Sequence, residues 1–291
     1  TPTAYHVIAL DDVPHKSWGR SRIGWLVECE RVKYEQVDPI VSPGRPSGHL
    51  HEFFGNGNIG STLTTQQLLD TPQRDIACSD TNDRSGYWAP AVYQGDRRIE
   101  ADVFKAYYKS TTTDTVPMPL GLRMIAGDAG ATKNQKRHVG FWEQQRKSTD
   151  KPNQAYNTAG SDRMITRIDD ERMLVLRMNY PNCWDGKHLD SPDHQSHVAY
   201  ADHKTQACPA SHPHKIPQLT TFTRYDTDGG EDFRLSSGAW HTFHQDFWNG
   251  WDPTQMDELN QLCIHGESNC RVRGSSNLKK HGQYVEFVPA R

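Results

Sequence analysis

The sequence predicts an all-β protein, an antiparallel β-sandwich of the jelly-roll kind with long loops and one or two short helices. Three observations predict it. Apolar residues alternate with polar or small ones in many short runs, Gly, Pro, Asp or Asn bounds each run, and helical periodicity is rare. No internal repeat or Pro/Ser-rich linker divides the chain, so residues 1–291 are expected to form a single domain.

The alternating runs are expected to be half-buried strands, because successive side chains of a strand point to opposite faces of a sheet. They cover residues 23–27, 99–103, 122–126, 173–180, 218–225, 233–235 and 283–288. Residues 128–162 are polar and lack a pattern, so the sequence predicts a long surface excursion there.

Two segments carry helical signals. Residues 252–265 begin with Asp252, which is suited to cap a helix, and continue with Pro253 at its first position and apolar residues on one face. A shorter helix is expected over residues 64–70, ended by Pro72.

Composition excludes two classes of protein. The 291 residues carry 33 Lys and Arg against 36 Asp and Glu, so no excess of positive charge exists to neutralise a phosphate backbone. No apolar run approaches the ~20 residues that span a bilayer. The mean hydropathy is −0.83, yet 8 Trp, 11 Tyr and 9 Phe oppose disorder. We therefore expect a soluble monomer that binds neither nucleic acid nor membrane.

The cysteines predict the compartment. The chain begins at Thr1 without a leader-like segment, as expected of a trimmed secreted protein. It has six cysteines and no Cys-x-x-Cys pair, which favours three disulfides in an oxidising, extracellular compartment. Six cysteines allow ~15 connectivities. Pairing neighbours along the chain gives Cys29–Cys78, Cys183–Cys208 and Cys263–Cys270.

Two apolar segments carry histidines at strand spacing. His49 and His51 would project from the same face of a strand, where they form either a pair of metal ligands or a hydrogen-bonded pair. In the second segment, alternation places His244, Asp246 and Trp248 on one face. We interpret that face as the wall of a site and the opposite face as core.

A polar loop forms a third cluster. Residues 182–197 hold three Asp and three His beside a tryptophan, directly after a predicted strand. Carboxylates can supply the acid, base or nucleophile of a sugar-active site, and an indole can stack on a pyranose ring. The alternative is a loop whose Asp side chains cap backbone N–H groups, and both roles are expected within the cluster.

Together these segments resemble the secreted domain-of-unknown-function family DUF1996. The residues that carry the resemblance are 38–44, 49–55, 87–90, 121–127, 183–186, 189–197, 208–213 and 243–252. They occur in family order over about residues 38–252. The resemblance implies an extracellular protein of fungi or actinobacteria and, from the modules joined to family members, a polysaccharide or oligosaccharide as partner. It implies no mechanism.

The leading hypothesis is a glycoside hydrolase, because four carboxylates fall in these clusters beside His and Trp residues. Its candidate catalytic residues are Asp185, Asp190, Asp193, His194 and Asp246. Its candidate substrate-binding residues are Trp184, Arg123, Trp248 and Trp251.

Three alternatives stay open. In a metalloenzyme, His49, His51, His197 and His244 would bind one ion of copper, zinc or calcium, with hydrolytic or oxidative chemistry. In a polysaccharide lyase, Arg123 would neutralise a uronate carboxylate. The last alternative is a glycan- or cell-wall-binding protein without catalysis.

Overall fold

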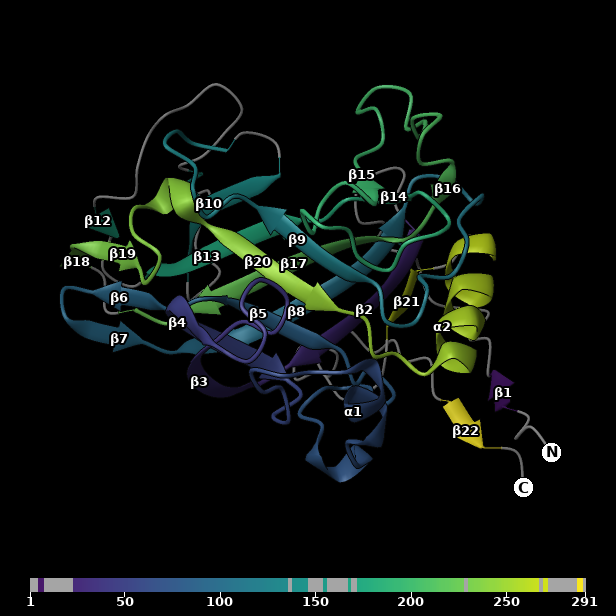
Figure 1. The fold of residues 1–291 in the computed structure, drawn as a ribbon, viewed down its shortest axis with the longest axis horizontal. Coiled ribbons are helices and arrows are strands. Elements are labelled where there is room, and N and C mark those ends of the chain that lie inside the picture. Colours follow the sequence, from purple (N-terminus) through teal and green to yellow (C-terminus); the bar gives the residue numbers. More distant parts are fainter. Residues whose placement is uncertain are drawn as a thin grey trace.

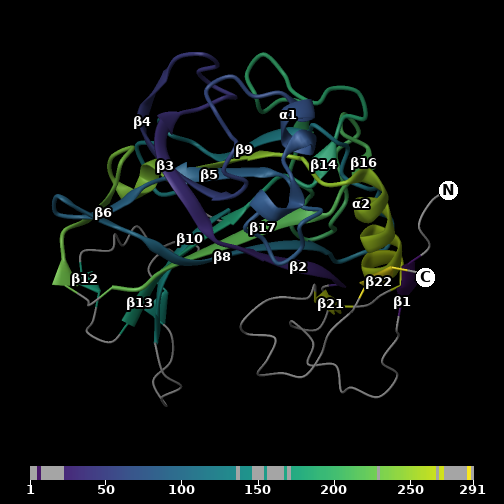
Figure 2. The same ribbon diagram turned by 90° about the horizontal axis from the view of Figure 1, so that it is seen from below.

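A computed structural model describes residues 5–7, 23–135, 138–145, 154–155, 167–168, 172–227, 230–266, 269–271 and 287–289. In this part of the chain, two large sheets pack face to face, and Figures 1 and 2 show the two layers from two directions. The predicted all-β sandwich is therefore confirmed.

The larger sheet has seven strands, which are antiparallel except for the parallel pair at one edge. In spatial order they are β11 (Gln154–Ala155), β10 (Val139–Gln145), β13 (Arg172–Asn179), β17 (Gln218–Tyr225), β8 (Ala101–Ser110), β2 (Ile23–Cys29) and β21 (Asn269–Arg271).

The smaller sheet has five antiparallel strands and carries the candidate site. In spatial order they are β3 (Arg31–Val37), β4 (Pro46–Gly55), β5 (Gly86–Pro90), β20 (His244–Trp248) and β9 (Arg123–Gly127). Strands from distant parts of the sequence thus become neighbours.

Short elements surround the sandwich. The small sheets consist of β1 (Tyr5–Val7) with β22 (Phe287–Pro289); β12 (Arg167–Ile168) with β18 (Gly230–Glu231); β15 (Val198–Ala199), β14 (Cys183–Trp184) and β16 (His214–Lys215); and β19 (Phe233–Leu235), β6 (Val92–Gln94) and β7 (Arg97–Ile99). The helical elements are α1 (Thr65–Asp70), η1 (Gln73–Asp75), η2 (Trp240–Thr242), α2 (Pro253–Leu259) and η3 (Asn260–His265).

Both predicted helices form, and the second has its predicted cap. Thr64 and Gln67 make a capping box at α1. The Asp252 side chain accepts hydrogen bonds from the amides of Thr254 and Gln255 at the start of α2, which continues into η3.

Aromatic side chains join the two sheets. Phe54 of β4 stacks on Phe104 of β8 with ring centroids 4.3 Å apart, and Tyr87 and Phe247 pack beside them. These side chains are fully or almost fully buried and belong to one continuous apolar core. The inner faces of β4, β5 and β20 are therefore used for folding, which leaves their outer faces for other roles.

A second, smaller core lies on that outer face. Phe53, Trp88 and Trp248 are buried there against residues of α1 and of the segments before it, including Ile40 and Leu68. The outer face of the five-stranded sheet is thus apolar at one end, while the histidines lie further along the same strands.

The structure differs from the sequence prediction at residues 128–162 and describes only part of the predicted strand over residues 283–288. Residues 128–162 were expected to lie outside the sheets, but β10 and β11 fall within this range, so that prediction was wrong. The run Val139-Gly140-Phe141-Trp142 at the start of β10 supplies the apolar residues of a sheet strand despite the polar surroundings. Of the predicted strand over 283–288, residues 283–286 lie outside the described residues.

All three predicted disulfides are present: Cys29–Cys78, Cys183–Cys208 and Cys263–Cys270. None of the six cysteines is free. Disulfides persist in oxidising compartments, so the covalent framework fits an extracellular protein. None of the helices in the described ranges is long and apolar enough to cross a bilayer.

Candidate metal centre

Strand register brings the histidines of two distant segments together. His51 of β4 pairs with Pro90 of β5. Asp246 of β20 pairs with Trp88, which also belongs to β5. His244, two residues before Asp246, is therefore level with His51 on the outer face of the sheet. His49 lies on the same face of β4, two residues before His51. The predicted alternation of residues 244–248 between two faces is present, with Phe247 on the inner face and His244, Asp246 and Trp248 on the outer face.

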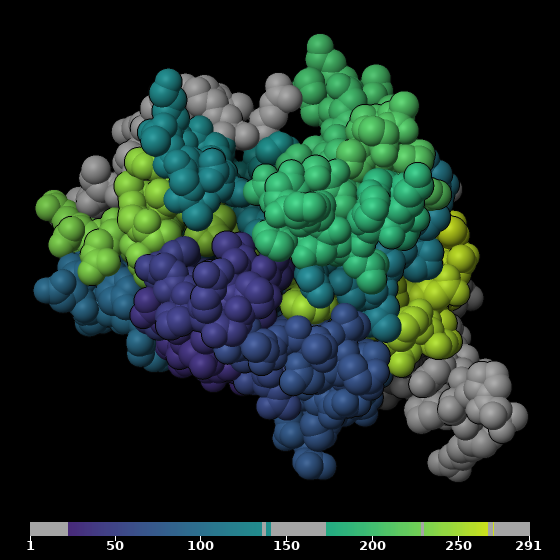
Figure 3. All heavy atoms as spheres, viewed as in Figure 1, coloured from purple at the N-terminus to yellow at the C-terminus, as the bar shows by residue number. Residues whose placement is uncertain are grey.

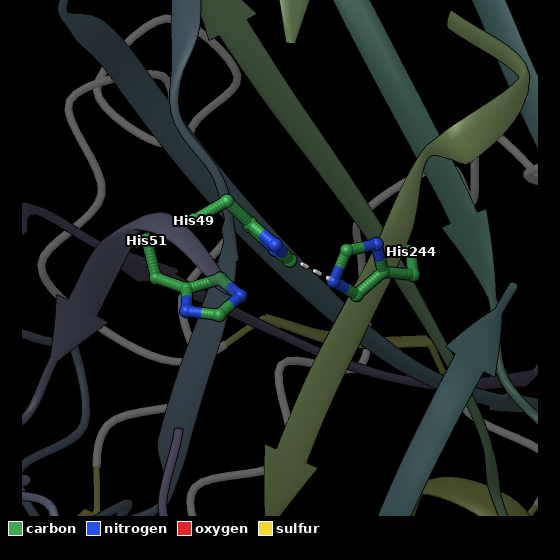
Figure 4. A group of neighbouring side chains, drawn as sticks. All are labelled: His49, His51 and His244. Atoms are coloured by element: carbon green, nitrogen blue, oxygen red, sulfur yellow. Dashed lines mark hydrogen bonds between the residues drawn. The ribbon is translucent and has the colours of Figure 1, made fainter. Parts of the chain in front are cut away.

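The three imidazoles form a compact group, which Figure 4 shows with their rings turned toward one another. One ring nitrogen from each of His49, His51 and His244 lies within 4.8 Å of the other two. The Nε2 atoms of His49 and His244 are 3.1 Å apart. Two nitrogens bound to one tetrahedral zinc ion at ~2.0 Å would be ~3.3 Å apart, so the spacing suits coordination of a shared ion.

Backbone carbonyls fix the tautomers of two of these rings. Nδ1 of His51 donates its hydrogen to the carbonyl of Val37, and Nδ1 of His244 donates to that of Thr242, both at 2.9 Å. Each ring therefore presents an unprotonated Nε2 to the group, and His49 is the donor in its bond to His244. Ligand histidines in metal sites are held in the same way.

Burial keeps the group neutral. His51 and His244 are buried, whereas His49 is half-buried and marks the side from which solvent enters. Burial, and next the neighbouring His244, lower the pKa of His49 to about 4. Burial is also the main cause that lowers the pKa values of His51 and His244. Neutral imidazoles are the form that binds metal ions.

Two carboxyl groups adjoin the imidazoles. One oxygen from each of Asp38 and Asp246 lies within 4.8 Å of the other and of a His51 nitrogen. Asp246 is fully buried, and neither of its oxygens has a hydrogen-bond partner. Burial raises the pKa values of both carboxyl groups.

The polar loop after β14 borders this region. On the face shown in Figure 3, its green segment adjoins the purple segment that carries β4. His194 is close enough to Asp38 for its charge to lower the pKa of that carboxyl group, although burial has the larger, opposite effect. Two of the three predicted clusters thus form the centre, and the third lies at its border.

Two carboxylates of this loop stabilise its turns by accepting hydrogen bonds from backbone amides of the same loop. Asp185 accepts hydrogen bonds from the amides of Lys187 and His188, and Asp193 accepts from those of Gln195 and Ser196. Burial alone would raise the pKa of Asp185, but hydrogen bonds from His188 and Lys187 lower it to about 2. The Ser191 hydroxyl and the Ser196 amide lower the pKa of Asp193. These are the contacts of capping residues.

Replacement of Asp185 by Ala should therefore loosen one turn. We expect trypsin to cut after Lys187 about tenfold faster, because hydrogen bonds to a charged acceptor contribute about 1.5 kcal/mol or more. Asp202 makes the same pair of bonds, to the amides of Lys204 and Thr205, and Asp202→Ala is the matched control. Asp202→Ala should accelerate trypsin cleavage after Lys204 and leave cleavage after Lys187 unchanged. Unchanged cutting in Asp185→Ala would contradict a capping role.

Asp190 is the loop carboxylate with a different environment. It accepts a hydrogen bond from Nη1 of Arg123 at 2.9 Å and another from Nδ1 of His194, also at 2.9 Å. The Arg123 guanidinium lies 3.8 Å from the ring centroid of Trp248. Arg123 thus binds a carboxylate of the protein itself, and the three polar side chains form a partly exposed group on the outer face of the sheet.

Other predicted site residues lie elsewhere. His197 is buried, and its two ring nitrogens bond to the Ser191 hydroxyl and the Arg123 carbonyl, so it does not join the three histidines. Trp251 is fully buried and packs edge-on against Trp25 and Tyr108 in the main core. Trp248 is also buried, with Nε1 donating to Thr65. Neither indole presents a face to a sugar.

Trp184 is the partly exposed indole of the candidate set. Its Nε1 donates to the carbonyl of His188 at 2.7 Å, which ties the ring to the polar loop. The ring lies beside that of His214. Trp184 is the candidate tryptophan that retains accessible surface.

Sequence reasoning missed Asp38 and the two carbonyls that orient the rings. Asp38 follows β3 and accepts hydrogen bonds from the amides of Ile40 and Val41. The dipeptide Asp38-Pro39 signals such a turn, but no local pattern shows that the turn returns to His51. The group formed by Cys29, Cys78 and Asp83 offers no thiolate, because the two cysteines are joined.

Comparison with known proteins gives one match. A family described as "Domain of unknown function (DUF1996)" matches residues 38–251. No curated protein and no solved structure matches the chain.

Proposed function

The chain belongs to the DUF1996 family, and from the geometry of its three-histidine group we propose that it is a secreted metalloenzyme acting on glycans. One observation supports a metal site: three neutral imidazoles lie close together, and backbone carbonyls fix the tautomers of two of them. The buried Nε2 of His51 has no hydrogen-bond partner, as expected of a nitrogen that is available to an ion.

The position of the centre supports an external substrate. His49 is half-buried on the outer face of the five-stranded sheet, and the group of Arg123, Asp190 and His194 lies on the same face. Such polar, partly exposed groups suit the hydroxyl groups of a sugar. An ion held by neutral imidazoles supplies Lewis acidity or, for copper or iron, redox chemistry.

Metal analysis tests the proposal. Protein purified without added metal, then incubated with one ion and desalted, should retain about one equivalent by elemental analysis, as a preformed site does. His49→Ala and His244→Ala should retain almost none. His203→Ala removes an exposed histidine and is the control that should match the wild type. Retention by all four proteins would refute the site.

Activity distinguishes the proposal from a carboxylate mechanism. A screen of neutral and acidic polysaccharides, with and without a reductant, should give products that disappear after chelation and return with the metal. A glycoside hydrolase that uses the carboxylates alone would keep its activity after chelation. Binding of glycans without any product would instead identify a binding protein.

A further inference from the structure

Asp190 and His194 of the polar loop form a carboxylate–imidazole pair outside the three-histidine group. Nδ1 of His194 lies 2.9 Å from Oδ1 and 3.1 Å from Oδ2 of Asp190. An ionised carboxylate only accepts hydrogen bonds, so Nδ1 carries the hydrogen of the neutral imidazole and Nε2 carries the lone pair. A carboxylate that fixes the tautomer of a histidine in this way prepares the ring for proton transfer.

The Asp190 side chain is itself held in place. Its Oδ2 accepts a hydrogen bond from Nη1 of Arg123, and its Oδ1 accepts one from the amide of Ser191, both at 2.9 Å. The Arg123 guanidinium lies over the ring of Trp248, which projects from the same face of β20 as His244. The pair is therefore anchored on the sheet face that carries the histidines.

Asp38 connects the pair to the three-histidine group. Burial raises the pKa of Asp38, whereas two backbone hydrogen bonds and the charges of His244 and His194 lower it. One oxygen of Asp38 also lies within 4.8 Å of a His51 nitrogen. Rings of both groups thus lie near the same carboxyl group.

His194 keeps an accessible nitrogen. In the described part of the chain no hydrogen bond to its Nε2 occurs, and 28% of the side chain is exposed. Its φ is 56°, a strained value for a residue other than glycine. The bond from its amide to the Ser191 carbonyl, at 2.8 Å, holds this conformation. The backbone is thus strained at the residue whose ring is accessible to a substrate.

The same loop contains a second histidine–aspartate pair for comparison. Nδ1 of His188 lies 2.6 Å from Oδ2 of Asp185. The His188 side chain is 65% exposed, and no ion pair links Asp185 to an arginine among the described residues. This pair therefore has the imidazole and the carboxylate but lacks the anchor on the sheet.

We propose that His194 is a general acid–base catalyst that hydrolyses a C–O bond of the glycan, with Asp190 as its positioning residue. This inference rests on the proposed function and names its reaction. Nε2 of His194 takes a proton from water as the water oxygen attacks carbon. The C–O bond then breaks, and Nε2 returns the proton to the leaving oxygen. One water is consumed for each bond, and the step needs neither an oxidant nor a reductant.

Replacement of His194 by Asn tests the role of Nε2. The Asn amide nitrogen can take the place of Nδ1 as donor to Asp190, and Asn tolerates a positive φ, so the loop is kept. On the polysaccharide of the screen that gives the most product, we expect kcat to fall about 100-fold or more with KM unchanged. His188→Asn makes the same change in the second pair and should keep the wild-type kcat.

Asp190→Asn tests the positioning role. It should also lower kcat with KM unchanged, because an amide has a single oxygen for the three donors that Asp190 now accepts. Products are measured as new reducing ends for a glycosidic bond and as free acid for an ester. All three variants should retain as much metal as the wild type, because none removes one of the three histidines of the metal site.

The outcomes separate this inference from the proposed function. An unchanged kcat in His194→Asn, or an equally large loss in His188→Asn, would overturn the inference and leave the metal site standing. So would products that form only with a reductant, because the reaction would then be oxidative. A wild type that retains no ion would overturn the proposed function, while a loss of kcat confined to His194→Asn and Asp190→Asn would still support the inference. A wild type that gives no product from any polysaccharide overturns both.

Discussion

Metal binding should raise the free energy of unfolding by about 4 kcal/mol when the free ion is at a thousandfold excess over its Kd. The ligands come from β4 and β20, which are assembled only in the folded chain, so the ion binds the native state in preference to the unfolded one. Urea unfolding with oxidised disulfides, with and without the ion, measures this gain.

The gain should disappear in His49→Ala and in His244→Ala and persist in His203→Ala. An increase of equal size in the histidine variants would place the bound ion elsewhere on the protein and contradict the site.

Asp83 should lower the stability of the metal-free protein as the pH rises from about 4 to about 7, a contribution that is measured as the difference between the wild type and Asp83→Asn. This carboxyl group is fully buried; it accepts hydrogen bonds from the Tyr87 hydroxyl and the Ser85 amide. Burial raises its pKa to about 7, against 3.8 for an ordinary Asp. The native state therefore holds a proton that the unfolded chain releases, and its stabilising effect is complete below pH ~4 and lost by pH ~7.

A difference of about three pKa units corresponds to on the order of 4 kcal/mol at most. Asp83→Asn should remove this part of the slope, since the amide does not titrate. Asp75→Asn, which changes an exposed carboxylate, should retain the wild-type slope. Urea unfolding in chelator across this pH range measures it, and parallel curves for wild type and Asp83→Asn would contradict the prediction.

Local patterns predicted much of the fold. Alternation predicted β2, β9, β13, β17 and β19. Asp252 and Pro253 predicted the start of α2, and Pro72 predicted the end of α1. The division of residues 244–248 between two faces followed from the period of two along a strand. The disulfides followed from pairing neighbouring cysteines, which succeeded because no bridge encloses another cysteine along the chain.

The assembly of the site depends on strand order, which local patterns do not encode. His51 and His244 meet because β5 lies between β4 and β20 and sets both registers. No spacing rule indicates that Asp38 is there too. Tryptophans were difficult to assign for another reason: an indole can fill a core or bind a sugar, and burial, which the sequence does not give, decides between the two.

Pro90 gives the centre a mechanical consequence. Proline has no amide hydrogen, and the pairing of β20 with β5 runs from Asp246 to Trp248 and stops before His244. The first residues of β20 are thus attached to the sheet through β9 alone, where His244 pairs with Gly127. A bound ion would link β4 to β20 where the backbone ladder has already ended. Amide hydrogen exchange at this end of β20 should therefore slow when the ion binds, while exchange near Trp248 stays the same.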